Sequence, residues 1–212
     1  MQLTAHRRSL TLCSGVLAIA AVSALTGCEN MDYFSQPLVG EPVCEPAWDG
    51  TWAATHETAL EFDETQPRVG LTLSQPPDCR GSTVAFELCE PSEEAGEDDE
   101  CGTFVGTIEF VRLGGRVFAN MRHVEADGDP VEGRDIDLVE IREVTESNAA
   151  FSLVEGKNLA ASIDAGRISG TYREGPHGYI MHVTSGGPEL ANLVAANPSL
   201  FEDYRLLFER VR

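Results

Sequence analysis

Basic residues are scarce in this sequence. The 212 residues include 15 Lys and Arg against 35 Asp and Glu, which gives a formal net charge of −20. Proteins that bind nucleic acid need clustered Lys and Arg to displace the counterions of the phosphates. The same deficit works against a purely electrostatic attraction to anionic lipid headgroups. The composition therefore argues against a nucleic-acid partner, and we interpret the acidity mainly as a source of solubility.

The sequence also lacks an unbroken apolar run of membrane-spanning length. Residues 10–27 come closest, but four Ser and Thr residues interrupt them, so a transmembrane helix is the weaker interpretation. Arg7 and Arg8 precede an apolar core at residues 16–25, and small residues follow it. A basic start, a short apolar core and small residues are typical of a secretory signal.

The end of this segment resembles the lipobox of bacterial lipoproteins. Leu25-Thr26-Gly27-Cys28 has the leucine, the two small or polar residues and the cysteine of that motif. The resemblance implies a signal peptide at residues 1–27 and lipidation of Cys28, with a thioether-linked diacylglycerol and an amide-linked palmitate. It also implies a membrane anchor in the bacterial cell envelope, and Glu29, in place of Asp, favours the outer over the inner membrane. The alternative is that Cys28 is an ordinary buried or disulfide-bonded cysteine.

The remaining chain divides into two predicted parts. Residues 28–47 contain three prolines and predict a lipidated tether, whereas residues 48–212 predict a single β-rich globular domain. Removing residues 1–27 leaves 185 residues, enough for one sizeable core. It also removes two arginines and no acid, so the net charge becomes −22. Contact with a membrane would then depend on the lipid.

Cysteine usage fits export to an oxidising compartment. Apart from Cys13 and Cys28, an even number remains, namely Cys44, Cys79, Cys89 and Cys101. Four cysteines permit three pairings. We favour Cys89–Cys101, which would join the ends of two predicted strands, together with Cys44–Cys79. A zinc site is the alternative, but the sequence contains no C-x-x-C pair.

Short segments with alternating apolar and polar residues dominate from Trp48 onward. Strands are predicted at residues 51–57, 68–74, 82–88, 102–113, 116–124, 136–144, 149–154, 159–163, 167–173, 179–184 and 204–211. Gly114 and Gly115 predict a tight hairpin, because glycine accepts positive φ at both turn positions. One helix is predicted after Pro188, with Leu190, Leu193 and Val194 on one face and an end at Asn197-Pro198.

This order of elements predicts an all-β fold, an antiparallel meander barrel or sandwich with one short C-terminal helix before the last strand. Gly50-Thr51-Trp52 resembles the G-x-W opening of lipocalin-like (calycin) barrels. The resemblance implies that Trp52 closes one end of a barrel and packs against an arginine of a late strand, here Arg205 or Arg210. The alternative is that Trp52 is an ordinary core residue, and the second motif of that family is not recognisable.

Motifs for catalysis or metal binding are incomplete. His56-Glu57 starts like a zinc-protease helix but lacks the second histidine, and His177 and His182 have an odd spacing, which places them on opposite faces of a strand. Ser185 lacks one glycine of a nucleophile elbow. We therefore assign no catalytic, cofactor-binding or metal-binding residue.

Two acidic clusters suggest calcium, which prefers oxygen ligands. One lies within residues 90–100, and the other comprises Asp127, Asp129, Asp135 and Asp137. Neither has the spacing of an EF-hand, so we interpret both as solvated loops.

Two hypotheses for function stay open. The preferred one is a non-enzymatic envelope lipoprotein that binds a small apolar ligand or an envelope protein partner. The alternative is a periplasm-facing hydrolase whose site is assembled only in the fold. An apolar cavity would favour the first hypothesis, and a cleft with convergent His, Ser and carboxylate groups would favour the second.

The lipobox makes a prediction about maturation. Cys28→Ser removes the thiol that accepts the lipid, so the precursor should stay uncleaved and should not incorporate labelled palmitate. The measurement is palmitate labelling with immunoblotting of the variant beside the wild type. A variant that matures at the same residue and stays on the membrane would show that this is not a lipoprotein.

Overall fold

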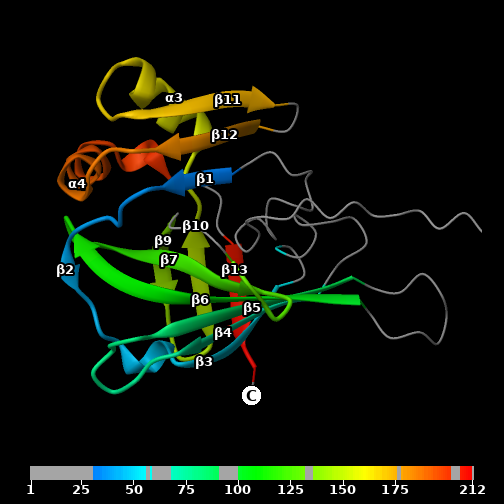
Figure 1. The fold of residues 1–212 in the computed structure, drawn as a ribbon. Coiled ribbons are helices and arrows are strands. Elements are labelled where there is room, and N and C mark those ends of the chain that lie inside the picture. Colours follow the sequence, from blue (N-terminus) through cyan, green and yellow to red (C-terminus); the bar gives the residue numbers. More distant parts are fainter. Residues whose placement is uncertain are drawn as a thin grey trace, which may run out of the picture.

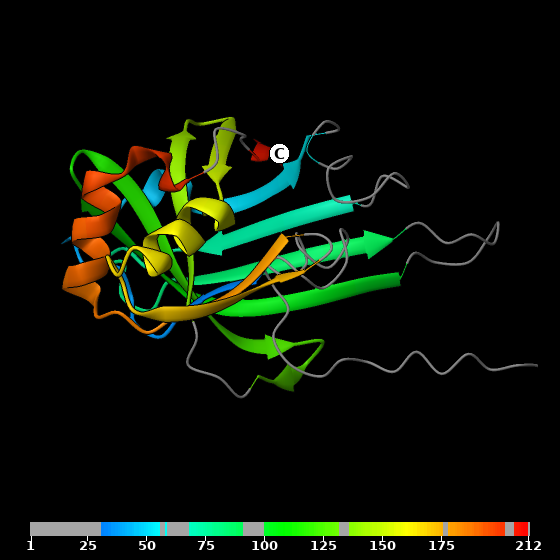
Figure 2. The same cartoon turned by 90° about the horizontal axis from the view of Figure 1, so that it is seen from above.

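The structure is a computed structural model, and it describes residues 31–55, 58, 68–90, 100–131, 136–175, 178–201 and 206–211. Within these residues, eight antiparallel strands close into a barrel (Figures 1 and 2). The strands are β3 (Gly50–Ala54), β4 (Arg68–Ser74), β5 (Thr83–Glu90), β6 (Glu100–Leu113), β7 (Arg116–Ala126), β9 (Asp137–Val144), β10 (Asn148–Ser152) and β13 (Leu206–Arg210). The predicted all-β meander is confirmed, and it is a barrel rather than a sandwich.

Each barrel strand pairs with the next one along the chain, and β13 pairs with β3 to complete the ring. The turn between β6 and β7 consists of Gly114 and Gly115, whose φ angles are 61° and 81°. Both values are positive, so the predicted glycine hairpin is confirmed. Two short strands, β2 (Glu41–Pro42) and β8 (Asp129–Pro130), extend the sheet beside β6 and β7.

A second layer is built from the chain between β10 and β13 and from the first described residues. It contains α3 (Gly156–Asp164), β11 (Gly170–Gly175), β12 (Gly178–Val183), α4 (Gly187–Ala196) and the 3-10 turn η2 (Pro198–Leu200). Strand β1 (Met31–Phe34) pairs in parallel with β12, which gives a three-stranded sheet in the order β1-β12-β11. This sheet and both helices lie on one side of the barrel (Figure 1).

Two hydrophobic cores lie on opposite faces of the barrel wall. The first lines the barrel lumen, and the second lies between the outer face of the wall and the second layer. On β7, Ala119 and Met121 point into the barrel lumen, whereas the side chain of Phe118 packs in the second core with Phe201. Side chains alternate between the faces of a strand, so a strand covered on both sides has an unbroken run of buried residues. Residues 118–121 are such a run.

A buried carboxylate lies in the barrel wall next to the second layer. The side chain of Glu140 on β9 is 3% exposed and accepts hydrogen bonds from Arg116 Nε and Nη2, at 2.6 and 2.7 Å. Arg142 Nη2 lies 3.0 Å from the same carboxylate. The Arg116 guanidinium also lies 5.4 Å from the centre of the Phe201 ring. A buried charge needs such paired and hydrogen-bonded neighbours, and this cluster lies where the barrel wall meets the second layer.

The structure corrects two predicted strands. Residues 159–163 belong to helix α3, because Leu159, Ala160 and Ile163 share one helical face toward the second core. The strand predicted at residues 167–173 begins only at Gly170. Ile168 is buried ahead of it, whereas Tyr172 is exposed and donates a 2.8 Å hydrogen bond to Asp164 Oδ2. That hydrogen bond raises the pKa of Tyr172.

The predicted tether is also corrected where the structure describes it. Residues 31–47 include β1 and β2, and Phe34 and Leu38 are each only 1% exposed. The Asn120 side chain accepts a 2.8 Å hydrogen bond from the Leu38 amide and donates a 3.0 Å bond to the Leu38 carbonyl. A few apolar anchors among the prolines therefore fasten this segment to the domain.

The Asn120 clamp can be tested directly. Asn120→Leu keeps the side-chain size but leaves the buried Leu38 amide and carbonyl unpaired, at a cost of about 1–3 kcal/mol for each lost partner. We expect slow hydrogen exchange of the Leu38 amide in the wild type and fast exchange in the variant. Equally fast exchange in the two proteins would show that the segment is a free tether after all.

Candidate functional site

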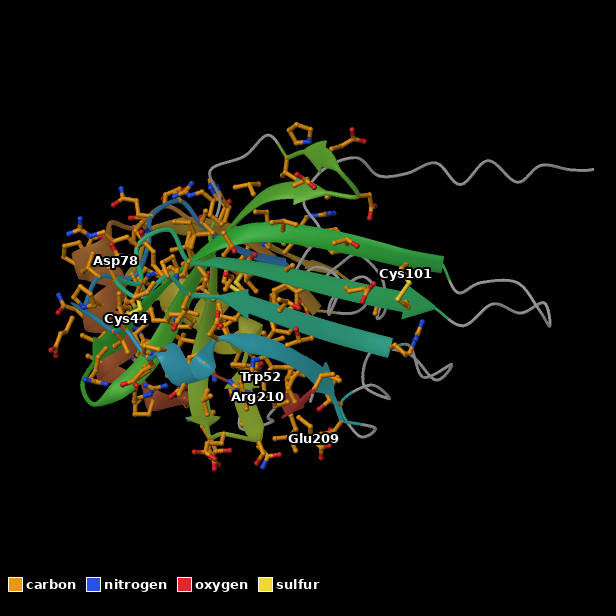
Figure 3. All side chains as sticks on the ribbon, turned by 90° about the horizontal axis from the view of Figure 1, so that it is seen from below. Cys44, Trp52, Asp78, Cys101, Glu209 and Arg210 are labelled. Carbon is orange, nitrogen blue, oxygen red and sulfur yellow. A yellow bond between two sulfur atoms is a disulfide. The ribbon has the colours of Figure 1, made fainter. Side chains whose placement is uncertain are left out.

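One end of the barrel is capped by an indole and a guanidinium. Trp52 on β3 is 2% exposed, and the guanidinium carbon of Arg210 on β13 lies 4.6 Å from the centre of the indole rings (Figure 3). The two residues are also direct partners in the pairing of β3 with β13. The predicted packing of Trp52 on a late arginine is confirmed for Arg210, whereas Arg205 lies outside the described residues.

The chain before β3 completes this cap. Arg210 Nη2 donates hydrogen bonds to the carbonyl oxygens of Ala47 and Asp49, the latter at 2.8 Å. Ala47 is part of the 3-10 turn η1 (Pro46–Trp48), and Asp49 directly follows that turn. Gly50 has a φ of 138°, and a Cβ there would lie 3.6 Å from the guanidinium carbon. Glycine therefore meets a backbone requirement at the start of the G-x-W motif.

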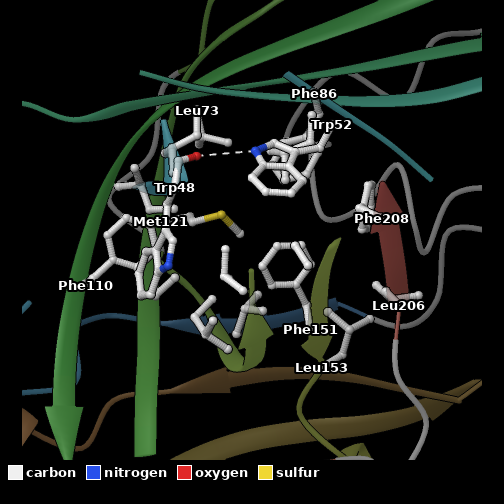
Figure 4. A pocket seen from close by; sticks show the side chains of 18 of the residues that line it. Trp48, Trp52, Leu73, Phe86, Phe110, Met121, Phe151, Leu153, Leu206 and Phe208 are labelled. Atoms are coloured by element: carbon white, nitrogen blue, oxygen red, sulfur yellow. Dashed lines mark hydrogen bonds between the residues drawn. The ribbon is translucent and has the colours of Figure 1, made fainter. Parts of the chain in front are cut away.

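The lumen below the cap contains an apolar cavity (Figure 4). The space open to the centres of water-sized molecules is about 70 Å³, within about 760 Å³ of unfilled space that extends to open solvent. Trp48 covers one side and packs edge-on against Phe110, with ring centres 4.7 Å apart. The lining side chains are all apolar: Trp48, Trp52, Val69, Leu71, Leu73, Val84, Phe86, Ile108, Phe110, Ala119, Met121, Val139, Ile141, Val144, Ala149, Phe151, Leu153, Leu206 and Phe208.

A polar pair lies at the opposite end of the lumen from Arg210. His123 on β7 and Asp137 on β9 are 9% and 8% exposed, and His123 Nε2 hydrogen-bonds to Asp137 Oδ2. The sequence patterns predicted no role for His123 and placed Asp137 in an acidic loop. The alternation of side chains along a strand could have identified both residues, because they lie two residues from Met121 and Val139, which face the lumen.

The structure contains both favoured disulfide bonds. Cys44–Cys79 fastens the segment before η1 to the turn between β4 and β5. Cys89–Cys101 joins facing residues of β5 and β6. Among the described residues, one group of three His, Cys, Asp or Glu side chains is close enough to share a cation. It consists of Glu87, Cys89 and Cys101. Two of its three members are sulfurs of the same disulfide, so it offers no thiolate ligands.

The calcium hypothesis gains no support from the second acidic cluster. Asp127 Oδ1 accepts a 2.8 Å hydrogen bond from the Thr103 amide, and Asp129 is exposed in β8. Asp137 faces the lumen, and these three carboxylates do not form a group close enough to share an ion. Asp135 and most of residues 90–100 lie outside the described residues.

The remaining motif residues do not converge. Ser185 is 3% exposed, and its Oγ accepts a 2.6 Å hydrogen bond from the Ser169 amide just before α4. His182 is exposed on β12, and its Nε2 lies 2.8 Å from Ser35 Oγ. That distance suits a nucleophile and a base, but neither residue lines the barrel cavity. His56, Glu57 and His177 lie outside the described residues, as do the lipobox and Cys28.

Comparison with known proteins leaves the function open, because no family model, no curated protein and no solved structure matches this chain. In the part of the chain that the structure describes, no helix is long and apolar enough to cross a membrane. The closed antiparallel barrel is consistent with the expected calycin-like architecture. The function has to be argued from the cavity.

The cap predicts a large effect of Trp52 on stability. Trp52→Ala removes a buried indole and should lower the free energy of unfolding by about 3–5 kcal/mol. Trp48→Ala should cost less, because Trp48 is only half-buried. Urea titrations of both variants, in the chain from residue 29 onward, measure the difference. A larger loss for Trp48→Ala would mean that η1, rather than the Trp52–Arg210 contact, holds this end of the barrel.

Proposed function

We propose that this protein is a non-enzymatic binding module of the cell envelope that holds a small apolar ligand inside its barrel. The cavity is the observation that carries the proposal. Protein interiors are close-packed, and voids larger than a water molecule are few. An apolar cavity of several water volumes stays dry and takes up apolar molecules. A lumen whose cavity has exclusively apolar walls is suited to that purpose.

The size of the cavity favours a slender ligand. A 150 Å³ apolar cavity accommodates a benzene ring, whereas the space open to molecular centres here is about 70 Å³. The residues that line the space include Trp48 beside the cap and Leu206 at the start of β13 (Figure 4). A linear alkyl chain is narrower than a fused ring system, so it suits a space of this volume better.

A hydrolase is supported less well. The Ser35–His182 pair is the observation in its favour. Catalysis also needs walls that position the substrate and exclude water, and this pair lies on an exposed surface of the three-stranded sheet. The lumen has such walls but presents no serine or cysteine nucleophile among its described lining residues.

The envelope location rests on the sequence and on the disulfide bonds. Residues 1–28 resemble a lipoprotein signal with its lipidation site at Cys28. Two disulfides suit an oxidising compartment. We propose that the lipid on Cys28 anchors the domain to a membrane, with the outer membrane favoured by Glu29.

Filling the cavity tests the proposal. The chain has two tryptophans, and both line the cavity, so their emission reports on its contents. Titration of the wild type with n-octane should give a saturable change in emission. Ala119→Phe places a ring in the cavity and should weaken binding at least about tenfold, since about 1.4 kcal/mol of lost contact suffices.

Ala53→Phe is the matched control, because Ala53 lies on β3 but is exposed outside the barrel. It should bind n-octane like the wild type. Urea titration of each variant shows whether it is folded. The proposal fails if the wild type gives no saturable signal, or if both phenylalanine variants bind equally well.

A further inference from the structure

The three-stranded sheet of the second layer has a covered face and an open face. Met181 and Val183 on β12 pack in the second core, and a Cβ on Gly156 would lie 3.2 Å from Met181 Cε, so α3 covers this face (Figure 2). Side chains alternate along a strand, so the residues in between form the other face. The open face consists of Ser35, Thr171, Arg173, Ile180 and His182. Three of these residues are exposed and two are half-buried.

The open face contains no carboxylate, although Asp and Glu make up 35 of the 212 residues. By contrast, five barrel strands each present an exposed glutamate, namely Glu87, Glu109, Glu125, Glu143 and Glu209. Within the sheet, Glu174 on β11 belongs to the covered face, because it is the register partner of Tyr179. The open face has an arginine, Arg173, and no described residue forms an ion pair with it.

The open face also lies next to the proposed lipid anchor. β1 is the third strand of this sheet, and its first residue, Met31, is the register partner of Ile180. Only Glu29 and Asn30 separate Met31 from Cys28. A lipid on Cys28 would therefore bring this sheet to the bilayer before the rest of the domain.

We propose that the open face docks on the anionic headgroups of the bilayer to which Cys28 is anchored. The lipid on Cys28 holds the domain at the membrane, and the open face sets its orientation there. The planar guanidinium of Arg173 suits the phosphate oxygens of a headgroup. This inference goes beyond ligand binding, and it rests on the proposed anchoring role of Cys28.

Screening by salt makes the local face matter more than the net charge of the chain. The Debye length at physiological ionic strength is about 8 Å, so a carboxylate farther than this from the headgroups adds little repulsion. An orientation that presents an exposed glutamate of the barrel brings like charges within that range. The open face brings only Arg173 and uncharged or imidazole groups, so it is the surface that approaches an anionic bilayer at the lowest cost.

The experiment supplies the anchor chemically, so it does not depend on native lipidation. In the chain from residue 28 onward, four cysteines form disulfides and Cys28 is the single free thiol. Cys28 is coupled to a maleimide lipid in bilayer nanodiscs made of equal amounts of phosphatidylcholine and phosphatidylglycerol. A gadolinium chelate on a fraction of the headgroups broadens the amide resonances of residues that lie near the bilayer.

We expect the amide resonances of Thr171, Arg173 and His182 to broaden more than that of Ala53, which is exposed on barrel strand β3. The difference should weaken in nanodiscs of phosphatidylcholine alone. It should also weaken in about 1 M salt, where the Debye length falls to about 3 Å.

Arg173→Glu is the test variant. It changes the charge of the open face by two units and should lower the ratio of open-face docking to other orientations about 30-fold. Lys157→Glu is the matched control, because it makes the same charge change at an exposed residue of α3, on the other side of the sheet. The control should keep the wild-type pattern of broadening. The amide spectrum of each variant also shows whether it is folded.

Three results overturn the docking proposal alone: uniform broadening in the wild type, strongest broadening over the barrel, or an unchanged pattern in Arg173→Glu. If the open-face resonances broaden without gadolinium as the protein concentration rises, the face binds a second copy of the chain instead. Palmitate labelling tests the anchor separately. If native Cys28 takes up no palmitate, the anchoring role is wrong and the docking proposal fails with it.

Discussion

The pairing of β13 with β3 is the contact on which the rest of this structure depends. These strands are the last and the first strand of the barrel along the chain, and their three paired positions turn an open meander into a ring. An open sheet of the same sequence would expose the side chains that now face the lumen. Closure removes the sheet edges, encloses the cavity and brings Arg210 over Trp52 in the same step. The pairing of β13 with β3 therefore produces the cap, the cavity and the closed fold together.

The second layer stabilises the wall from outside. Its core covers the outward face of β7 and β9, and the paired charges of Arg116, Glu140 and Arg142 lie at that boundary. A wall supported on its outer face does not need a filled interior to hold its shape. This support from outside is a physical reason why the lumen can keep unfilled space beside Met121 and Ala119 without collapsing.

Most of the barrel was predictable because its signals are local. Alternating residues in 68–74 and the pair Gly114-Gly115 specify a strand and a turn without reference to distant residues. Helix α3 was missed because five apolar and small residues at 159–163 fit either period in so short a window.

The functional site was only half predictable. Trp52 and its arginine were found through a motif, whereas His123 and Asp137 meet only because of the register between β7 and β9. Register depends on long-range pairing, which a single sequence does not reveal. Residues 31–47 were mistaken for a tether for the same reason. Phe34 and Leu38 find their partners on strands far along the chain.

The position of β1 has a mechanical consequence for the proposed lipid anchor. β1 begins at Met31, so only Glu29 and Asn30 separate it from Cys28. Three residue steps reach about 10 Å when extended, which is less than the thickness of a small domain. An acyl chain on Cys28 would then hold the three-stranded sheet close to the bilayer surface and restrict how the barrel tilts. The anchor would then hold the barrel at one position and orientation on the membrane. A molecule that delivers the ligand to the barrel or receives it would have to approach the barrel there.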